Sequence, residues 1–188
     1  MRLVPRSILD GYARALAWGG LGLGLAALIQ DRRWLAQPGI TMGLVALVIV
    51  LRRGQIQLSK FSYLSQVGIV ALVGSITLGP GITVFAIGLG VFIADAFWLR
   101  KLLRAAWINA AREVIGFMAA YGAYAFVFLR AGASGFTIEF LPPALTFAGM
   151  YFFCTRALFY FTLLIRGKLE AHERLMILRY EISPTCSP

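Results

Sequence analysis

The sequence has 188 residues, of which 60% are hydrophobic and 14% charged, and its formal net charge is +10. A soluble domain is ordinarily about 45–50% apolar and about 25% charged, so the composition excludes an ordinary soluble domain and predicts a polytopic membrane protein. In such a protein an excess of lysine and arginine reflects basic cytoplasmic loops that face anionic lipid head groups, so we expect anionic lipids and not nucleic acid as partners.

Six hydrophobic segments are each close to the roughly 20 residues that a helix needs to cross a bilayer. In chain order they are Tyr12–Ile29, Leu35–Leu51, Phe61–Leu78, Ile82–Leu99, Ala105–Leu129 and Phe140–Ile165. Pro38 and Pro142 fall in the first turns of the second and sixth segments, where a helix tolerates proline. The Gly-Pro-Gly turn at 79–81 is long enough only for a hairpin. The sequence therefore predicts an all-α, polytopic transmembrane helical bundle of about six spans, over residues 1–165.

Basic residues are distributed unevenly among the connections between these segments. The alternate loops contain only Arg32, Arg33 and Arg130. The N-terminus, the second and fourth loops and the C-terminal tail contain thirteen basic residues, namely Arg2, Arg6, Arg14, Arg52, Arg53, Lys60, Arg100, Lys101, Arg104, Arg166, Lys168, Arg174 and Arg179. Because lysine and arginine collect on the cytoplasmic side of a membrane, we expect both termini to lie in the cytoplasm (N-in, C-in).

The C-terminal tail, residues 166–188, mixes charged residues with apolar residues at helical spacing. The apolar members are Leu169, Leu175, Met176, Leu178 and Tyr180. This pattern predicts a cytoplasmic amphipathic helix that lies on the membrane surface or docks on a partner, and a solvated extension of the last span is the alternative. The one histidine of the chain, His172, lies in this tail, where we expect it to face solvent.

Polar and charged residues interrupt the fifth segment, which contains the stretch AAWINAAREVIGFMAA. An ionised side chain near the bilayer centre costs about 2.5–3.5 kcal/mol, so such groups face the bundle interior and find partners. From the depth of each residue along its helix, we expect Glu113 to pair with Arg156 of the sixth segment. On the same basis we expect Asp95 of the fourth segment to reach Asn109 or Arg112. The cluster is either a ligand pocket or proton-linked site, or a set of interhelical hydrogen bonds that stabilises the bundle.

The first segment contains small residues four positions apart, a spacing that lets helices approach closely. The GGLGLG stretch among them is not a dinucleotide fingerprint, because it lies inside a hydrophobic span with no strand before it. We therefore expect these residues, and two glycines of the fourth segment, to serve helix packing. They are Ala15, Gly19, Gly20, Gly24, Gly88 and Gly90.

The sixth segment is rich in aromatic residues, which predict either a lipid-facing and core-packing surface or a bed for a flat apolar cofactor such as a quinone, a carotenoid or a porphyrin. They are Phe147, Tyr151, Phe152, Phe153, Phe159, Tyr160 and Phe161. A buried haem needs an axial ligand and a zinc site several ligands, and Cys154, Cys186 and the tail histidine do not provide them together. We therefore expect no metal, and no cofactor besides lipid unless a flat apolar molecule lies against this segment.

Several short motifs are shared with a family of bacterial membrane modules. They are LSKFSYLS at 58–65, LGPG at 78–81, IAD at 93–95 and INAAR at 108–112, followed by an aromatic span that ends in a charged connector. Through these motifs the chain resembles the N-terminal, sensor-type membrane modules of bacterial signalling proteins that carry HD-GYP or GGDEF output domains. The resemblance covers about two thirds of the chain. The resemblance implies a helical fold in a bacterial inner membrane. Because the chain ends soon after the connector, we expect no output domain and no cyclic-dinucleotide activity here.

Two functions are consistent with these observations. The serines have no histidine near them and no paired carboxylates recur at the water boundary, so we expect no enzymatic activity. The first hypothesis is a non-catalytic accessory subunit that packs against other integral membrane subunits of a respiratory, photosynthetic or signalling complex. The alternative is a small-molecule-binding subunit that uses the charged cluster, either as a sensor input module or as a substrate-binding component. A glycine-proline hairpin similar to those in energy-coupling-factor vitamin transporters favours the alternative.

Overall fold

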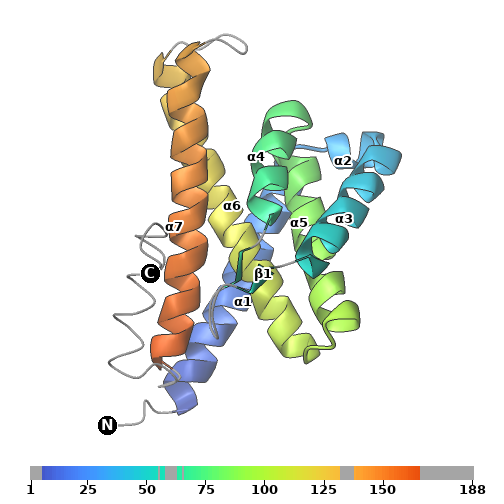
Figure 1. The fold of residues 1–188 in the computed structure, drawn as a ribbon, viewed down its shortest axis with the longest axis vertical. Helices are drawn as coiled ribbons and strands as arrows, with labels where there is room; N and C mark the ends of the chain where they lie inside the picture. Colours follow the sequence, from blue (N-terminus) through green and yellow to red (C-terminus); the bar gives the residue numbers. More distant parts are fainter. Residues whose placement is uncertain (1–5, 55, 58–62, 65, 132–137, 166–188) are drawn as a thin grey trace, which may run out of the picture.

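The computed structural model describes residues 6–54, 56–57, 63–64, 66–131 and 138–165, which form helices, the short connections between them and one pair of two-residue strands (Figure 1). The helices are α1 (Arg6–Gln30), α2 (Arg33–Ala36), α3 (Pro38–Arg53), α4 (Val67–Thr77), α5 (Pro80–Ile93), α6 (Leu103–Ala131) and α7 (Leu141–Ile165). A π-helical turn, η1 (Ala94–Trp98), continues α5, and a 3-10 turn, η2 (Ile138–Phe140), precedes α7. The strands β1 (Ile56–Gln57) and β2 (Tyr63–Leu64) pair antiparallel.

Each of the six predicted segments contains a helix, but the third was wrong at its start, where Tyr63–Leu64 form β2 and α4 begins only at Val67. Among the described residues only four helices are long and apolar enough to cross a membrane. These are Ser7–Gln30, Pro80–Trp98, Leu103–Ala131 and Ile138–Thr162. At about 1.5 Å per residue, α3 extends about 24 Å and α4 about 16 Å, less than the roughly 30 Å of a hydrocarbon core. The predicted helical bundle is therefore confirmed, with four helices compatible with membrane spans and two shorter apolar helices packed among them.

Helix α5 lies at the centre of the bundle, where it packs against α1, α3, α4 and α6. In the apolar membrane-length stretch of Pro80–Trp98, 56% of the residues are buried inside the bundle. In the corresponding stretch of Ile138–Thr162, which contains most of α7, 11% are buried. Helix α6 packs along both α1 and α7, so the long α6–α7 pair forms one flank of the molecule and the shorter α3 and α4 the other (Figure 1). The fully buried apolar side chains of the core include Val48, Ile87, Val91, Phe117 and Phe147.

The beginnings of α1 and α6 and the end of α7 lie at the same end of the bundle (Figure 1). The Tyr12 hydroxyl donates a hydrogen bond of 3.1 Å to the Leu158 carbonyl, and the Tyr12 ring lies 5.0 Å from the Phe161 ring, edge to face. Arg104 forms an ion pair with Asp10 in the same region. The first and last long helices therefore have their outer ends on the same side of the bundle.

At the opposite end a carboxylate joins α1 to α5. Asp31 directly follows α1 and accepts a hydrogen bond of 2.9 Å from the Gly81 amide in the first turn of α5, where the helix dipole favours a negative charge. Arg33 donates to the same carboxylate from two nitrogens, at 2.9 and 3.1 Å. Gly79 has a φ of 95°, and a Cβ at this position would lie 2.1 Å from the Arg33 guanidinium, so the predicted hairpin requires glycine there.

The Asp31 carboxylate makes the stability of the fold depend on pH. Burial raises the pKa of Asp31, but hydrogen bonds from Arg33 and from the Gly81 amide outweigh that effect and hold the pKa below its ordinary value. A carboxylate with a depressed pKa stabilises the fold above its unfolded pKa of about 3.9, and this contribution is lost as the pH falls through the folded pKa. We expect Asp31→Asn to lower the thermal unfolding temperature near neutral pH, and to lower it less in acid, because the charge of wild-type Asp31 is lost as the pH falls through the folded pKa. An equal loss at both pH values in detergent would contradict the role of the charge.

Two of the predicted packing glycines lie at close helix contacts. A Cβ on Gly20 of α1 would lie 2.6 Å from the backbone of Ala111 in α6. A Cβ on Gly90 of α5 would lie 2.8 Å from the side chain of Val48 in α3, which is fully buried. At both positions the absence of a side chain lets two helices touch.

The other four predicted packing residues are placed differently. A Cβ on Gly24 or Gly88 would contact Val114 at 3.6 and 3.4 Å, which are ordinary or slightly tight distances. Ala15 and Gly19 are exposed. Successive residues of a helix point about 100° apart around its axis. The face of α1 that packs on α6 therefore carries Gly20, and Gly19 points away from it.

The contact at Gly90 predicts a measurable difference between two glycine variants. Replacing a mid-helix glycine with alanine ordinarily stabilises a helix by roughly 0.5–1 kcal/mol. We expect that gain for Gly43→Ala in α3, because no described residue of a neighbouring element lies within 4 Å of the added Cβ. For Gly90→Ala we expect a net loss of about 1–3 kcal/mol, since Val48 cannot move without disturbing the core. Unfolding in mixed micelles measures both, and a stabilised Gly90→Ala protein would contradict the close contact.

Candidate functional site

An arginine near the end of α3 binds acidic side chains of two other elements. Arg52 is only 4% exposed. Its Nε and one terminal nitrogen donate to the two carboxylate oxygens of Asp95 in η1, at 3.1 and 3.3 Å. Its other terminal nitrogen donates to Glu113 of α6 at 3.3 Å. One buried guanidinium therefore joins α3, η1 and α6.

Both carboxylates have further partners, as buried charges require. Asp95 is fully buried, and the Asn109 amide, one of the two partners predicted for it, donates a hydrogen bond of 2.6 Å. The Lys101 ammonium lies 3.0 Å from the same carboxylate. Glu113 is 5% exposed and accepts a hydrogen bond of 2.7 Å from the Tyr151 hydroxyl of α7.

The backbone between α5 and α6 places two of these groups side by side. Asp95 lies in the π-helical turn η1, and such turns are frequent at functional sites. Arg100 then adopts a left-handed φ of 49°, and the Lys101 amide donates to the Asp95 carbonyl at 2.9 Å. The chain reverses here, so the Lys101 side chain returns to the Asp95 carboxylate.

A cavity of about 800 Å³ adjoins this ion network. Its wall is formed by the end of α3, the beginning of α4, Lys101, and the facing sides of α6 and α7. Its volume falls within the roughly 300–1,000 Å³ of typical small-molecule sites. The polar residues of the wall are Arg52, Arg53, Gln66, Lys101, Asn109, Arg112, Glu113, Tyr151, Thr155 and Arg156.

Positive charge predominates around the cavity. Five cationic side chains line it, and Glu113 in the wall and Asp95 behind it supply two negative charges, so these groups together carry +3. Burial lowers the pKa of Lys101, and Arg52 and Arg112 lower the pKa further, against the opposing effect of Asp95. The cavity therefore favours the binding of a negative charge.

Arg112 of α6 is incompletely paired. Its side chain is 12% exposed, and its closest carboxylate oxygen, on Glu113, lies 3.9 Å away and already accepts from Arg52. The guanidinium carbon lies 5.1 Å from the centre of the Phe159 ring. Its Nε has no hydrogen-bond partner among the described residues, although a guanidinium presents five donors and an unsatisfied buried donor costs about 1–3 kcal/mol. An anion in the cavity would supply the missing acceptor.

The structure gives Glu113 other partners than the predicted Arg156. Glu113 binds Arg52 and Tyr151, whereas Arg156 lines the cavity with its guanidinium 5.5 Å from the centre of the Phe152 ring. Depth along a helix placed Glu113 and Arg156 at one level, but depth does not fix the direction in which each side chain leaves its helix. All members of the predicted cluster nevertheless belong to the ion network or to the cavity wall.

Sequence reasoning missed three participants. Arg52 and Lys101 were assigned to cytoplasmic loops, and Tyr151 was grouped with the aromatic residues of the sixth segment. Two carboxylates inside apolar segments require at least two buried cations, and a cation count could have directed attention to the arginine at the end of the second segment. No sequence pattern distinguishes Tyr151 from its aromatic neighbours.

The aromatic residues of α7 divide between the interior and the surface. Phe147 and Tyr151 are buried, and the Phe147 ring lies 6.1 Å from the Phe117 ring of α6. Phe152 and Phe153 are 50% and 68% exposed. One face of α7 therefore packs on α6, and another presents aromatic side chains outward.

The remaining predictions concern the tail and metal binding. The tail, with His172 and Cys186, lies outside the described residues. Within the described part of the chain, no group of three or more histidine, cysteine, aspartate or glutamate side chains could hold a metal ion.

No protein-family model matches the sequence, and neither does a curated protein or a solved structure.

Proposed function

We propose that this protein is a membrane-embedded binding module for a small carboxylate or phosphate anion, which occupies the charged cavity between α3, α4, α6 and α7. One observation carries the proposal: Arg112 is buried in the cavity wall with an unsatisfied Nε, in surroundings of net positive charge. A carboxylate or phosphate would accept two hydrogen bonds from such a guanidinium. The resemblance to sensor-type modules supports a role as the input part of a signalling or transport system.

The ion network beneath the cavity is suited to position the binding groups. Arg52 and Lys101 are held by Asp95 at 3.0 to 3.3 Å. The Tyr151 hydroxyl is held by Glu113. Groups fixed by such contacts lose little freedom when a ligand binds, which favours affinity. Apolar side chains such as Leu72 also line the cavity, and an ion pair is stronger in less polar surroundings than in bulk water.

We further propose that all six apolar segments lie in a bacterial inner membrane, with both termini in the cytoplasm. The outer ends of α1 and α7 lie on the same side of the bundle, as an even number of segments requires, and the basic residues concentrate on that side. In this orientation the ion network lies toward the cytoplasmic face. Labelling of single cysteines from outside intact cells tests it: Gly39→Cys should react and Ser7→Cys should not, in a background without Cys154 and Cys186.

The binding function is tested with three anions of different chemistry. Purified protein in mild detergent is heated with inorganic phosphate, with succinate or with adenosine monophosphate, and with the neutral succinamide as the matched control. A ligand that binds only the folded state stabilises it by an amount that rises with the logarithm of its concentration above the dissociation constant. We therefore expect at least one anion to raise the unfolding temperature in this way. Succinamide should have no effect. Absence of stabilisation by all three anions, together with no organic anion released from gently purified protein, would contradict the proposal.

An accessory subunit remains a second candidate, and the outward face of α7 favours it. Phe152 and Phe153 are 50% and 68% exposed, and exposed aromatic residues are enriched at protein interfaces. Co-purification from gently solubilised membranes separates the two functions. Stoichiometric partner proteins that are lost when Phe153 is replaced by alanine would support the accessory role.

A further inference from the structure

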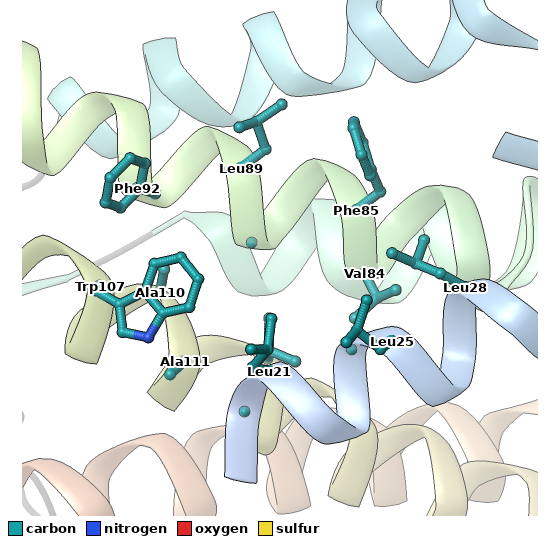
Figure 2. A pocket seen from close by; sticks show the side chains of 14 residues that line it. Leu21, Leu25, Leu28, Val84, Phe85, Leu89, Phe92, Trp107, Ala110 and Ala111 are labelled. Carbon is teal, nitrogen blue, oxygen red and sulfur yellow. The ribbon is translucent and has the colours of Figure 1, made fainter. Parts of the chain in front are cut away.

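A second hollow, of about 220 Å³, lies between α1, α5 and α6 and is lined almost wholly by apolar groups. Figure 2 shows leucines of α1 and apolar side chains of α5 around it, with Trp107 of α6 at one end. Gly24 of α1 and Gly88 of α5 are part of its lining. Because neither glycine has a side chain, the helices leave space here that larger residues would fill.

This hollow continues toward the end of the bundle where α1 begins. An adjacent hollow of about 400 Å³ shares Leu21 and Trp107 with it and is also lined by Arg14 and Arg104. We call the two adjoining hollows together the α1 groove. It is apolar at one end and bordered by two arginines at the other.

The α1 groove is long enough for an acyl chain of one lipid leaflet and part of its head group. From Arg14 to Leu28, both of which line it, the helix rises about 21 Å. Half of a bilayer's hydrocarbon core is about 15 Å thick. A lipid with its phosphate near Arg14 would therefore extend an acyl chain along the groove to the apolar hollow. Tryptophan is enriched at the boundary between head groups and acyl chains, where Trp107 would lie.

The two arginines at one end of the α1 groove favour a lipid with a negatively charged head group. Arg14 and Arg104 face one described carboxylate, that of Asp10, which binds Arg104. The Arg104 side chain is 65% exposed in spite of this pair, so its remaining donors are accessible. We propose that the α1 groove binds one anionic phospholipid, with its phosphate at Arg14 and Arg104 and one acyl chain between α1, α5 and α6. This site is separate from the charged cavity and does not rest on the function proposed for it.

Native mass spectrometry tests the α1 groove with two lipids of identical acyl chains. The purified full-length protein is incubated with equal amounts of phosphatidylglycerol and phosphatidylcholine, and the bound lipids are counted. We expect wild type to retain one phosphatidylglycerol in preference to phosphatidylcholine. Gly24→Val should lose it, because the added side chain fills the groove. Gly22→Val is the matched control: Gly22 is exposed on another face of α1 with no atom near its Cβ, and it should retain the lipid.

A second variant tests the head group without filling the groove. At about 1 kcal/mol for each basic residue near an anionic lipid, Arg14→Gln should reduce the preference for phosphatidylglycerol about fivefold while the circular dichroism stays that of wild type. Three results would overturn the proposal. They are equal lipid retention by Gly24→Val and Gly22→Val, equal retention of the two lipids by wild type, and occupation of the groove by a quinone or a partner protein.

Discussion

Replacing Arg52 with methionine is expected to lower the free energy of unfolding by about 3–5 kcal/mol. The substitution keeps an apolar chain of similar length but removes the donors that bind Asp95 and Glu113. Asp95, which is fully buried, would keep Lys101 and Asn109 as partners. The two buried carboxylates would then have one cation fewer to neutralise them. Removing one partner of a buried ion pair is strongly destabilising because it leaves an uncompensated buried charge.

The neighbouring arginine provides the control for this experiment. Arg53 is exposed and lies with its guanidinium carbon 4.4 Å from the centre of the Trp98 ring. An exposed cation–π contact is worth roughly 0.5–1 kcal/mol, so Arg53→Met should destabilise the protein by no more than that. Unfolding of both variants in mixed micelles measures the difference. Similar losses for the two would show that Arg52 does not hold the network together, and restoration of stability by Asp95→Asn and Glu113→Gln in the Arg52→Met background would support the charge argument.

Replacing Arg112 with methionine is expected to have the opposite effect on stability and a large effect on binding. Without ligand, the variant should be as stable as wild type or more stable, because the substitution removes a buried cation with an unsatisfied donor beside Arg52. Glu113 would keep its bonds from Arg52 and Tyr151. Binding of the anion that stabilises wild type should weaken by about tenfold or more, since a hydrogen bond to a charged group contributes about 1.5–3 kcal/mol.

A remote arginine on the same helix serves as the control for binding. Arg130 lies at the far end of α6, is exposed, and contacts the Phe126 ring. Arg130→Met removes the same charge from the protein but not from the cavity, so it should leave the dissociation constant unchanged. Isothermal titration with phosphate, succinate or adenosine monophosphate, whichever stabilises wild type, measures this constant. Unchanged affinity in Arg112→Met, or equal weakening in both variants, would refute a role for Arg112 in binding the anion.

The contrast between Arg52 and Arg112 separates the two interpretations of the charged cluster. A cluster that only stabilises the bundle would lose stability at either position, because each charge would serve a neighbouring helix. A binding site would lose stability at Arg52 and affinity at Arg112. The geometry favours this division of roles, because Arg52 makes three hydrogen bonds to carboxylates while the Arg112 Nε makes none.

The sequence by itself determined the class of the protein and the places where its helices break. Hydrophobic segment length and proline position depend only on local composition, so the helices that begin at Pro38, Pro80 and Leu141 start within three residues of the predicted segments. The Gly-Pro-Gly hairpin was predictable because only glycine tolerates the φ that Gly79 adopts. Small residues at helical spacing likewise predicted close contacts between helices. They did not show whether Gly19 or Gly20 of α1 makes the contact.

Only the tertiary structure decided which charges meet. Glu113 and Arg156 were matched by depth, yet Glu113 turns toward Arg52 of α3, 61 residues away in the sequence. Partner choice depends on the rotation of each helix about its axis and on which helices are neighbours, and both are set by the packing of the whole bundle. The cavity and the α1 groove have the same origin, because a space between helices exists only where several chain segments fail to fill it together.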